Sequence, residues 1–352
     1  MKMVLTTLAV FFIAATLLPF IRHEAWWIRI FDFPRAQIAV AGILITVAYV
    51  LFWDTKSVLE AVVLGVLLLC VGYQAAKMFP YTALASHQVT QAKAIDDSTK
   101  LSVLIANVLM TNRESNAFLA LINQYDPDIV LTLETDDWWS EQLAALDTEY
   151  SYVVKMPLPN TYGMILHSRK ELVDPQVKYV VEDSIPSIHA KVRLDSGVEV
   201  FLHCLHPKPP YPEEDTDTVD RDAELLIVGR EAKKRDAPTI VMGDMNDVAW
   251  SYTTSLFQKI SGLLDPRIGR GMYNSYSAKS PILRWPLDHL FHSEHFSLID
   301  LQRLPAWGSD HFSIFVHLQY SPEGEPANDR PEADPEDEEQ AADKIQEARE
   351  GE

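Results

Sequence analysis

The stretch TIVMGDMNDV, residues 239–248, ends an apolar run with a carboxylate and a carboxamide two positions apart. In an extended chain, residues i and i+2 point to the same side, so Asp244 and Asn246 could reach one ligand together. Gly, Asp and Asn are also common in turns. On this stretch alone, a strand-ending turn is the better explanation, and other parts of the chain must decide.

Several other apolar runs carry a polar residue at one end. The runs LSVLIANV, DIVLTLE, VFLHCLH, RWPLDHLF and WGSDHFSIFV contribute Asn107, Glu134, His206, Asp288, Asp310 and His311. Each residue taken singly has an ordinary structural explanation. In layered α/β folds, however, strand ends cluster at one rim, where binding sites are built. The joint occurrence therefore favours a functional site.

The elements that must position these residues lie between 101 and 320. Candidate strands are 101–108, 128–133, 163–168, 187–194, 198–205, 238–242, 285–292 and 311–318, and candidate helices are 115–125 and 219–235. Several later strands alternate apolar and polar residues, which suits antiparallel pairing with one covered face. We expect one α/β domain built from two stacked mixed sheets flanked by helices.

The order of these polar residues is characteristic. Asn, Glu, His, Asp-x-Asn, Asp and then Asp-His, across residues 101–320, resembles the endonuclease/exonuclease/phosphatase superfamily, and the most specific pieces are PDIVLTLE, GDMN, LDHLF and SDH. That superfamily includes deoxyribonuclease I, abasic-site endonucleases, sphingomyelinases and inositol-polyphosphate phosphatases, and its membrane-anchored bacterial members look similar in layout. The resemblance implies a four-layer α/β sandwich and metal-dependent cleavage of phosphate esters.

The expected chemistry assigns metal ligands first. Phosphate-ester hydrolysis needs a hard cation on the phosphoryl oxygens, an activated water and help for the leaving oxygen. Mg²⁺, with Mn²⁺ as an alternative, takes oxygen ligands and often only one or two carboxylates. We expect Glu134 to be the first ligand, with Asn107 and Asp310 beside it.

The remaining residues are expected to act on the water and the phosphate. Asp244 would orient or deprotonate the water, and Asn246 would donate to the phosphoryl oxygen. His311 would serve as base or phosphate-binding group, oriented by Asp288, because a carboxylate fixes the imidazole tautomer and stabilises its charged form. His206 matches the other histidine of the resembling family, which contacts phosphate or serves as acid.

The stretch HCLHPKPP offers two histidines for that last role. His203 and His206 would lie on opposite faces of a strand, so only one can point into the site, and we choose His206 because it stands at the strand end. A zinc site from His203, Cys204 and His206 is disfavoured, since at most two of them share a face. The partner that orients this histidine is not fixed by the sequence, although Asn160 and Tyr162 lie in a plausible loop.

Three apolar runs precede the domain. Residues 3–21, 36–53 and 57–76 contain Glu60 as their only charged residue, and each approaches the ~20 residues that cross a bilayer. A signal peptide is the alternative for the first run, because Lys2 precedes it, and buried core helices are the alternative for the others. Three runs in succession favour a three-span anchor over residues 1–76, which makes this a multi-pass membrane protein of bacterial inner-membrane type.

Basic residues in the short loops predict the orientation. Arg22, Arg29, Arg35, Lys77 and Lys93 lie on the side of the large domain, against Lys2 and Lys56 on the other. Because basic residues are retained on the cytoplasmic side, the count favours a cytoplasmic catalytic domain.

Two segments outside the domain are predicted to lack regular structure. Residues 77–100 are polar and irregular, which is typical of a linker. Residues 321–352 contain thirteen acidic and three basic residues with repeated proline, a composition that cannot form a core and predicts a disordered tail. No protein partner is predicted.

Charge bears on the substrate. Residues 96–320 carry a net charge of −13, which disfavours tight, sequence-independent binding to nucleic-acid backbones. A membrane tether suits a lipid head-group, although anchored enzymes also act on soluble substrates, so nuclease and lipid or small-molecule phosphodiesterase stay near equals. The alternative from another class is a catalytically inactive, membrane-anchored binding or scaffold protein, because fold alone does not fix function.

Overall fold

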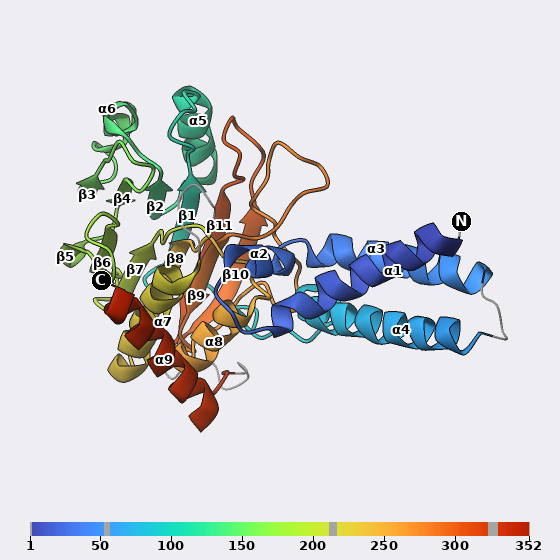
Figure 1. Cartoon of the computed structure of the whole chain (residues 1–352). Coiled ribbons are helices and arrows are strands. Elements are labelled where there is room, and N and C mark those ends of the chain that lie inside the picture. The colour runs from blue at the N-terminus through green and yellow to red at the C-terminus, as the bar shows by residue number, and fades with distance from the viewer. Residues whose placement is uncertain (1, 53–56, 211–216, 323–329, 352) are drawn as a thin grey trace.

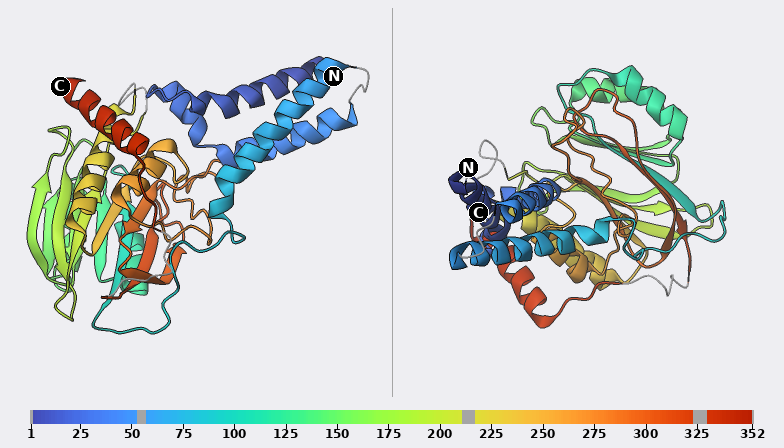
Figure 2. Two further views of the ribbon diagram at one scale, coloured as in Figure 1. Left: turned by 90° about the horizontal axis from the view of Figure 1, so that it is seen from below. Right: turned by 90° about the vertical axis from the view of Figure 1, so that its right-hand side faces the viewer.

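Two β-sheets lie face to face in the computed structural model, which describes residues 2–52, 57–210, 217–322 and 330–351 (Figures 1 and 2). The first sheet has the order β10(Phe296–Arg303), β11(Ile314–Tyr320), β1(Lys100–Asn107), β2(Ile129–Leu133), β4(Met164–Ser168), β3(Tyr152–Met156). The second has the order β5(Leu172–Lys178), β6(Ser187–Arg193), β7(Glu199–Leu205), β8(Thr239–Asp244), β9(Asp288–His292). Both sheets mix parallel and antiparallel pairs.

The alternation of side chains along the strands creates four layers. On β1, Val103 and Ile105 pack in the core between the sheets, whereas Leu104 and Ala106 pack against α5(Ser115–Tyr125) and α6(Asp137–Leu143). On β8, Val241 faces α7(Val219–Arg235) and α8(Tyr252–Ser261) on the opposite outer surface. Successive strand residues point to opposite faces, so a fully apolar strand covers both. The predicted four-layer α/β sandwich is confirmed.

The strand directions bring the candidate residues to one rim. β1 runs parallel to β2, and β7 runs parallel to β8, so Asn107, Glu134, His206 and Asp244 all follow carboxyl ends of strands. β9 runs antiparallel to β8, and its first residue, Asp288, is paired in register with Asp244.

Three long helices form a bundle that projects from the domain (Figure 1). They are α1(Lys2–Leu17), α3(Arg35–Leu51) and α4(Val58–Met78); the short helix α2(Trp26–Arg29) and 3-10 turns at Leu18–Phe20, Ile30–Asp32 and Phe79–Tyr81 complete this region. Lys2–Phe20 and Val58–Tyr81 are long and apolar enough to cross a membrane. Trp26–Asp32 and Arg35–Leu51 meet at 72° and form a third candidate if the bent pair is one span. Residue 53, the last of the expected second run, lies outside the described residues.

The bundle and the domain share a packed junction. The indole Nε1 of Trp250 donates to the Asp32 carbonyl at 2.7 Å, and the Tyr81 hydroxyl donates to the Ala249 carbonyl at 2.6 Å. Phe33 meets Trp285 edge-on, with ring centroids 5.9 Å apart. The predicted linker 77–100 is irregular after residue 81. It packs against the domain, where residues 90–92 hydrogen-bond to residues 298 and 299.

The C-terminal segment differs from the prediction of disorder. Pro335–Gly351 forms α9, which lies across α7 and α8 (Figure 1). Three of its apolar residues, Ala341, Ile345 and Ala348, share one buried helical stripe. Asp334 and Asp337 each accept the other's backbone N–H, at 2.9 and 3.1 Å, so the helix begins with a reciprocal cap. Spacing and capping therefore outweigh composition here; residues 323–329 of the predicted tail lie outside the described residues.

A buried ion-pair chain connects α9 to the rim. Lys344 pairs with Glu24 from the loop after α1, and with Asp222 of α7 at 2.9 Å. Arg221 pairs with Asp222 at 2.8 Å and donates to the Asn246 carbonyl at 2.9 Å. Although burial raises the pKa of Asp222, Lys344 and Arg221 together hold it below its usual range.

Lys344→Met is therefore expected to destabilise the protein. Asp222 would keep Arg221 but lose one charged partner in a buried setting, which corresponds to about 1.5–3 kcal/mol. The midpoint of thermal unfolding of the full chain in detergent measures this. Arg349→Met, on the exposed face of the same helix, is the matched control; an equal effect of both substitutions would refute a specific role for Lys344.

A second prediction concerns Glu224, which is buried on α7. Burial, reinforced by Glu182 and Asp220, raises its pKa to about 8, against about 4.3 in an unfolded chain. The stabilisation that the neutral carboxyl provides is thus complete below the unfolded value, and it is lost as the pH rises to 8. We expect Glu224→Gln to gain stability over the wild type progressively from pH 5 to pH 8.

Thermal unfolding of wild type and Glu224→Gln across that pH range is the measurement. Glu141→Gln, an exposed position on α6, controls for loss of a carboxylate as such. A difference between wild type and Glu224→Gln that stays constant with pH would contradict the assigned protonation.

Candidate active site

Asn107 and Glu134 meet at the ends of β1 and β2. The Asn107 amide Nδ2 donates to Glu134 Oε1 at 2.7 Å and to Asp244 Oδ2 at 3.1 Å. Glu134 has a φ of +59°, a left-handed conformation that is uncommon outside glycine. Met110 N donates to its second oxygen at 3.3 Å. The geometry brings two carboxylates to one buried amide.

Asp244 lies at the centre of the rim. Its Oδ2 is 3.7 Å from His311 Nε2 and 4.0 Å from His206 Nε2, and its Oδ1 accepts the Asn246 N–H at 3.0 Å. The preceding Gly243 has a φ of +142°, and a Cβ there would come 1.9 Å from the Leu205 carbonyl oxygen. Only glycine lets β8 pass β7 this closely, which explains the Gly-Asp order of the motif.

His311 and Asp288 form a tight pair. His311 Nδ1 lies 2.7 Å from Asp288 Oδ2, and both side chains are buried. Burial alone would lower the pKa of His311, but the Asp288 and Asp244 carboxylates raise it to about 10. The ring is therefore an imidazolium at neutral pH, with Nδ1–H donated to Asp288 and Nε2–H directed toward Asp244.

His206 also lies at this rim, beside Asp244. The ring is buried, and its centroid is 5.6 Å from that of Tyr162. Its Nδ1 has no hydrogen-bond partner among the described residues. Tyr162 is thus the neighbour that the sequence suggested without fixing.

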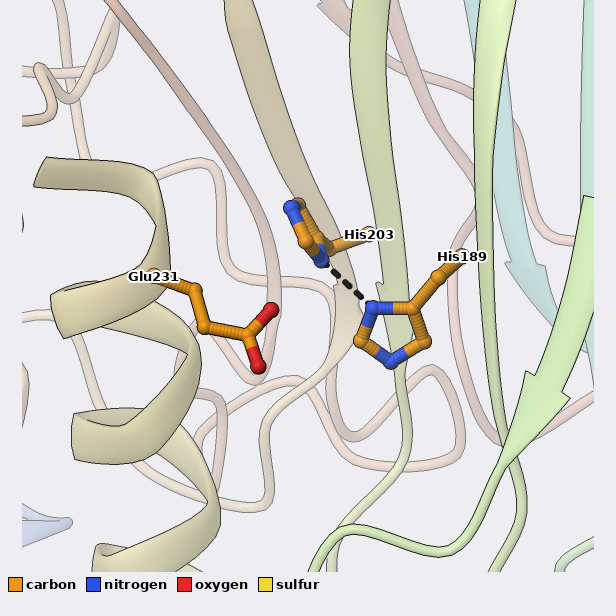
Figure 3. Close-up of side chains that lie close together, drawn as sticks. All are labelled: His189, His203 and Glu231. Carbon is orange, nitrogen blue, oxygen red and sulfur yellow. Dashed lines mark hydrogen bonds between the residues drawn. The ribbon is translucent and has the colours of Figure 1, made fainter. Parts of the chain in front are cut away.

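His203 faces the opposite side of the second sheet, toward α7, where it forms a cluster with His189 and Glu231 (Figure 3). His203 Nδ1 and His189 Nδ1 are 2.7 Å apart, Arg235 donates to His203 Nε2 at 2.7 Å, and His189 Nε2 meets the Ser187 hydroxyl at 2.8 Å. Burial lowers the pKa of His189 to about 3 and that of His203 to about 2.

The spacing of this cluster would admit a metal ion, but its surroundings do not favour one. All four ring nitrogens of His189 and His203 already have hydrogen-bond partners. In addition, the positively charged Arg235 guanidinium lies against His203 Nε2, where it would repel a cation. We interpret it as a structural network that ties β6, β7 and α7 together. The two histidines of the HCLH stretch thus lie on opposite faces of the second sheet.

The side chains of Asn246 and Asp310 form no hydrogen bond with the other candidate site residues. Asn246 directs its Nδ2 to the Pro207 carbonyl at 2.9 Å, which fixes the loop after β7. The Asp310 carboxylate is half-buried and makes no hydrogen bond or ion pair with another described residue, although its charge helps to raise the pKa of His311. The structure therefore brings together Asn107, Glu134, His206, Asp244, Asp288 and His311, with these two beside them.

Three positioning residues were missed at the sequence level. The Ser309 hydroxyl donates to the Asn107 carbonyl at 2.8 Å and accepts the His311 N–H at 3.0 Å. The Ser275 hydroxyl accepts the Asp288 N–H at 3.0 Å. Tyr276 packs on His311 with ring centroids 5.0 Å apart. Ser309 belongs to the SDH motif and could have been inferred, whereas Ser275 and Tyr276 stand in a loop without a pattern.

The donor set fits a hard divalent cation. Glu134 and Asp244 both accept a hydrogen bond from the Asn107 amide. Asp244, Asp288 and His311 also offer ligand atoms within 4.8 Å of one another. The carboxylates of Glu134 and Asp244 thus lie on either side of one amide, and carboxylate oxygens are the ligands that Mg²⁺ or Mn²⁺ prefers.

The sequence matches the model of the Endonuclease/Exonuclease/phosphatase family over residues 104–311, which includes the residues just described. A search among curated proteins returned no match.

Solved structures share the fold. A protein from Beutenbergia cavernae described as an endonuclease/exonuclease/phosphatase has 17% identity and a TM-score of 0.51, covering 63% of this chain and 72% of its own. The human Nocturnin catalytic domain with a bound sulfate anion has 18% identity and a TM-score of 0.50, covering 65% and 96%. TDP2 of D. rerio, complexed with a single-strand DNA product, has 18% identity and a TM-score of 0.50, covering 62% and 99%. At these identities the likeness concerns architecture.

Proposed function

Because the chain belongs to the Endonuclease/Exonuclease/phosphatase family, we propose that it is a divalent-metal-dependent phosphoesterase that works at a membrane surface. The observation that carries the proposal is the convergence of Glu134, Asn107 and Asp244 with the His311–Asp288 pair at one rim. Oxygen donors for a cation and a charged imidazole for an anion lie side by side there, as cleavage of a phosphate ester requires.

Glu134, Asn107 and Asp310 would hold the metal, with Mg²⁺ the expected ion and Mn²⁺ an alternative. When bound, the cation supplies positive charge to the phosphoryl oxygens. Asn107 lies beside both carboxylates, because its Nδ2 donates to Glu134 and Asp244, and its Oδ1 accepts the Leu109 N–H at 3.0 Å.

The side chains divide the remaining tasks. Asp244 orients the attacking water and takes its proton, since its Oδ2 lies between the two histidines, 3.7 Å from His311 Nε2 and 4.0 Å from His206 Nε2. His311, held by Asp288, donates Nε2–H to a phosphoryl oxygen. His206 protonates the leaving oxygen or binds phosphate from the other side of Asp244. Asn246 donates to the phosphoryl oxygen through the amide hydrogen that Pro207 does not use.

A membrane location is supported by the surface of the helical bundle. Large apolar side chains on α4 point outward, with Val58 79% and Leu69 75% exposed. Such exposure is costly in water and suits hydrocarbon, and α4 at 21 residues is about 31 Å long, close to the thickness of a bilayer core. The loop after α1 and the domain lie at the same end of the bundle, so the excess of basic residues there favours the cytoplasmic side.

The test is hydrolysis by the purified full chain in detergent. Bis(4-nitrophenyl) phosphate reports diesterase activity and 4-nitrophenyl phosphate reports monoesterase activity, each with Mg²⁺, with Mn²⁺ and after chelation. We expect turnover only with metal. A folded, metal-binding protein that turns over neither substrate would favour the inactive binding or scaffold protein instead.

A further inference from the structure

An open groove runs between the bundle and the catalytic domain, next to the rim. Its volume is about 560 Å³, and its helical wall is the apolar side of α3 with Val40, Ala41 and Leu44. The opposite wall belongs to the domain and includes Arg284 and Arg303. One wall is therefore part of a helix that we place in the membrane, and the other belongs to the domain that carries the candidate active site.

The two arginines on the domain wall form an unneutralised pair. Both guanidinium groups stack on Phe312, with Cζ 4.9 Å (Arg284) and 4.4 Å (Arg303) from the ring centroid. Burial and the charge of Arg284 lower the pKa of Arg303. Neither forms an ion pair with a carboxylate among the described residues; they donate hydrogen bonds to the backbone carbonyls of Ser277, Ser280 and Asn274. Two cations held together without an acid make a site for an anion.

This anion site adjoins the catalytic residues. Phe312, on which both arginines stack, directly follows His311. Tyr276 packs on His311 and also on Trp285, with centroids 5.0 and 5.8 Å apart. Trp285 in turn meets Phe33 at the bundle. The two arginines are therefore linked to His311 through Phe312, and the bundle is linked to it through Trp285 and Tyr276.

The loop beside the groove carries an apolar tip. Ile282 and Leu283 are 71% and 53% exposed, and the Gln37 amide on α3 donates to the Ile282 carbonyl at 2.6 Å, which fastens the loop to the helix. Exposed apolar residues followed at once by an arginine suit the boundary between hydrocarbon and head-groups. With α3 in the bilayer, such a loop would put the groove near the level of the lipid phosphates.

We propose that this groove admits an anionic glycerophospholipid from the bilayer and that this lipid is the substrate. Its acyl chain lies along Val40, Ala41 and Leu44, and Arg284 and Arg303 hold the negative charge of its head-group. The inference rests on the proposed phosphoesterase function and adds the substrate class. A nucleic acid would make no favourable contact with an apolar wall, and the net charge of −13 over residues 96–320 would repel its phosphates.

The first test is independent of catalysis. The full chain is placed in phosphatidylcholine vesicles containing phosphatidylglycerol with a photoreactive acyl chain, and the crosslinked residues are mapped by mass spectrometry. We expect adducts within 36–44 and 281–284. Arg284→Gln/Arg303→Gln should lower their yield roughly tenfold or more, since each basic residue near the surface contributes to anionic-lipid binding.

The matched control is Lys233→Gln/Lys234→Gln, which removes two positive charges from exposed positions on α7 and should leave the yield unchanged. Ile282→Ser/Leu283→Ser tests the groove without touching the arginines that stack beside His311, and it should also reduce the adducts. Adducts absent from both segments, or unaffected by either groove variant, would overturn the assignment of a lipid groove whatever the hydrolysis shows.

The second test compares phosphatidylglycerol vesicles with glycerophosphoglycerol, the same diester without acyl chains. We expect a higher kcat/KM for the lipid, and a smaller ratio of the two constants in Arg284→Gln/Arg303→Gln than in the lysine control. Equal values, or hydrolysis of bis(4-nitrophenyl) phosphate but of neither glycerol diester, would overturn the substrate class alone. Failure on all three diesters and on 4-nitrophenyl phosphate would overturn the phosphoesterase itself.

Discussion

Asp244→Asn is expected to reduce metal-dependent phosphodiester hydrolysis by about 10²–10⁴-fold, the usual contribution of a positioned general base. Asp244 is the residue whose carboxylate lies within 4.0 Å of His206, His311 and the Asn107 amide. The amide of the variant keeps the size of the side chain but can neither accept a proton from water nor balance the charge of His311. The loss should therefore fall on kcat, measured with bis(4-nitrophenyl) phosphate at saturating Mg²⁺.

The control for this substitution is Asp195→Asn, in the exposed turn between β6 and β7, which should retain wild-type turnover. Thermal unfolding of Asp244→Asn shows whether the fold survives. Wild-type kcat in a folded Asp244→Asn would remove Asp244 from the mechanism.

Glu134→Gln is expected to act on metal binding. Its carboxylate sits half-buried at the end of β2 and touches Asn107 and the Met110 N–H. Replacing it with an amide removes the negative charge that attracts a hard cation. We expect the dissociation constant for Mg²⁺ to rise on the order of 10- to 100-fold, which isothermal titration detects without any substrate.

A partial return of activity at high Mg²⁺ would accompany this change, because the other residues of the rim stay in place. Glu141→Gln, exposed on α6, should bind Mg²⁺ like the wild type. If Glu134→Gln bound the ion with unchanged affinity while losing turnover, Glu134 would act on the substrate rather than on the metal.

Much of the fold follows from local sequence. The helix expected over 115–125 is α5, and the one expected over 219–235 is α7, with those same bounds. Periodic apolar spacing and the Asp-Pro stop define α5, so short-range physics suffices there. All eight expected strands correspond to strands in the sheets. In contrast, β3, β5 and β10 were missed. β3 and β5 have few buried residues, which gives a weak pattern, and a bulge between Leu298 and Asp300 interrupts the alternation of β10.

The C-terminal helix shows what composition conceals. A count of charges over 321–352 predicts disorder, whereas α9 depends on three apolar residues with helical spacing and on a cap formed by Asp334 and Asp337. The sequence Asp-Pro-Glu-Asp ahead of that stripe was a legible start signal. The pairing of Lys344 with Asp222 could not be predicted from the sequence, because the two residues are 122 positions apart.

The candidate site was largely predictable because strand ends gather at one rim. The structure places His206 at the rim, directly after β7, and His203 on the opposite face of the second sheet, because an odd number of positions in an extended chain reverses the face. The residues that position the site residues could not be predicted. Ser275 and Tyr276 come from an irregular loop, and Arg221 reaches the Asn246 carbonyl from a helix, so only the assembled fold brings them to the site.

The central claim is that water attacks phosphorus at this rim with the help of a bound divalent ion. The measurement that tests it most directly is turnover of bis(4-nitrophenyl) phosphate by the full chain in ¹⁸O-labelled water, with Mg²⁺ and after chelation. We predict one labelled oxygen in the 4-nitrophenyl phosphate product, formed only with Mg²⁺ and not by Asp244→Asn. Label in the nitrophenol, turnover that survives chelation, or no turnover by the folded wild type would contradict the account.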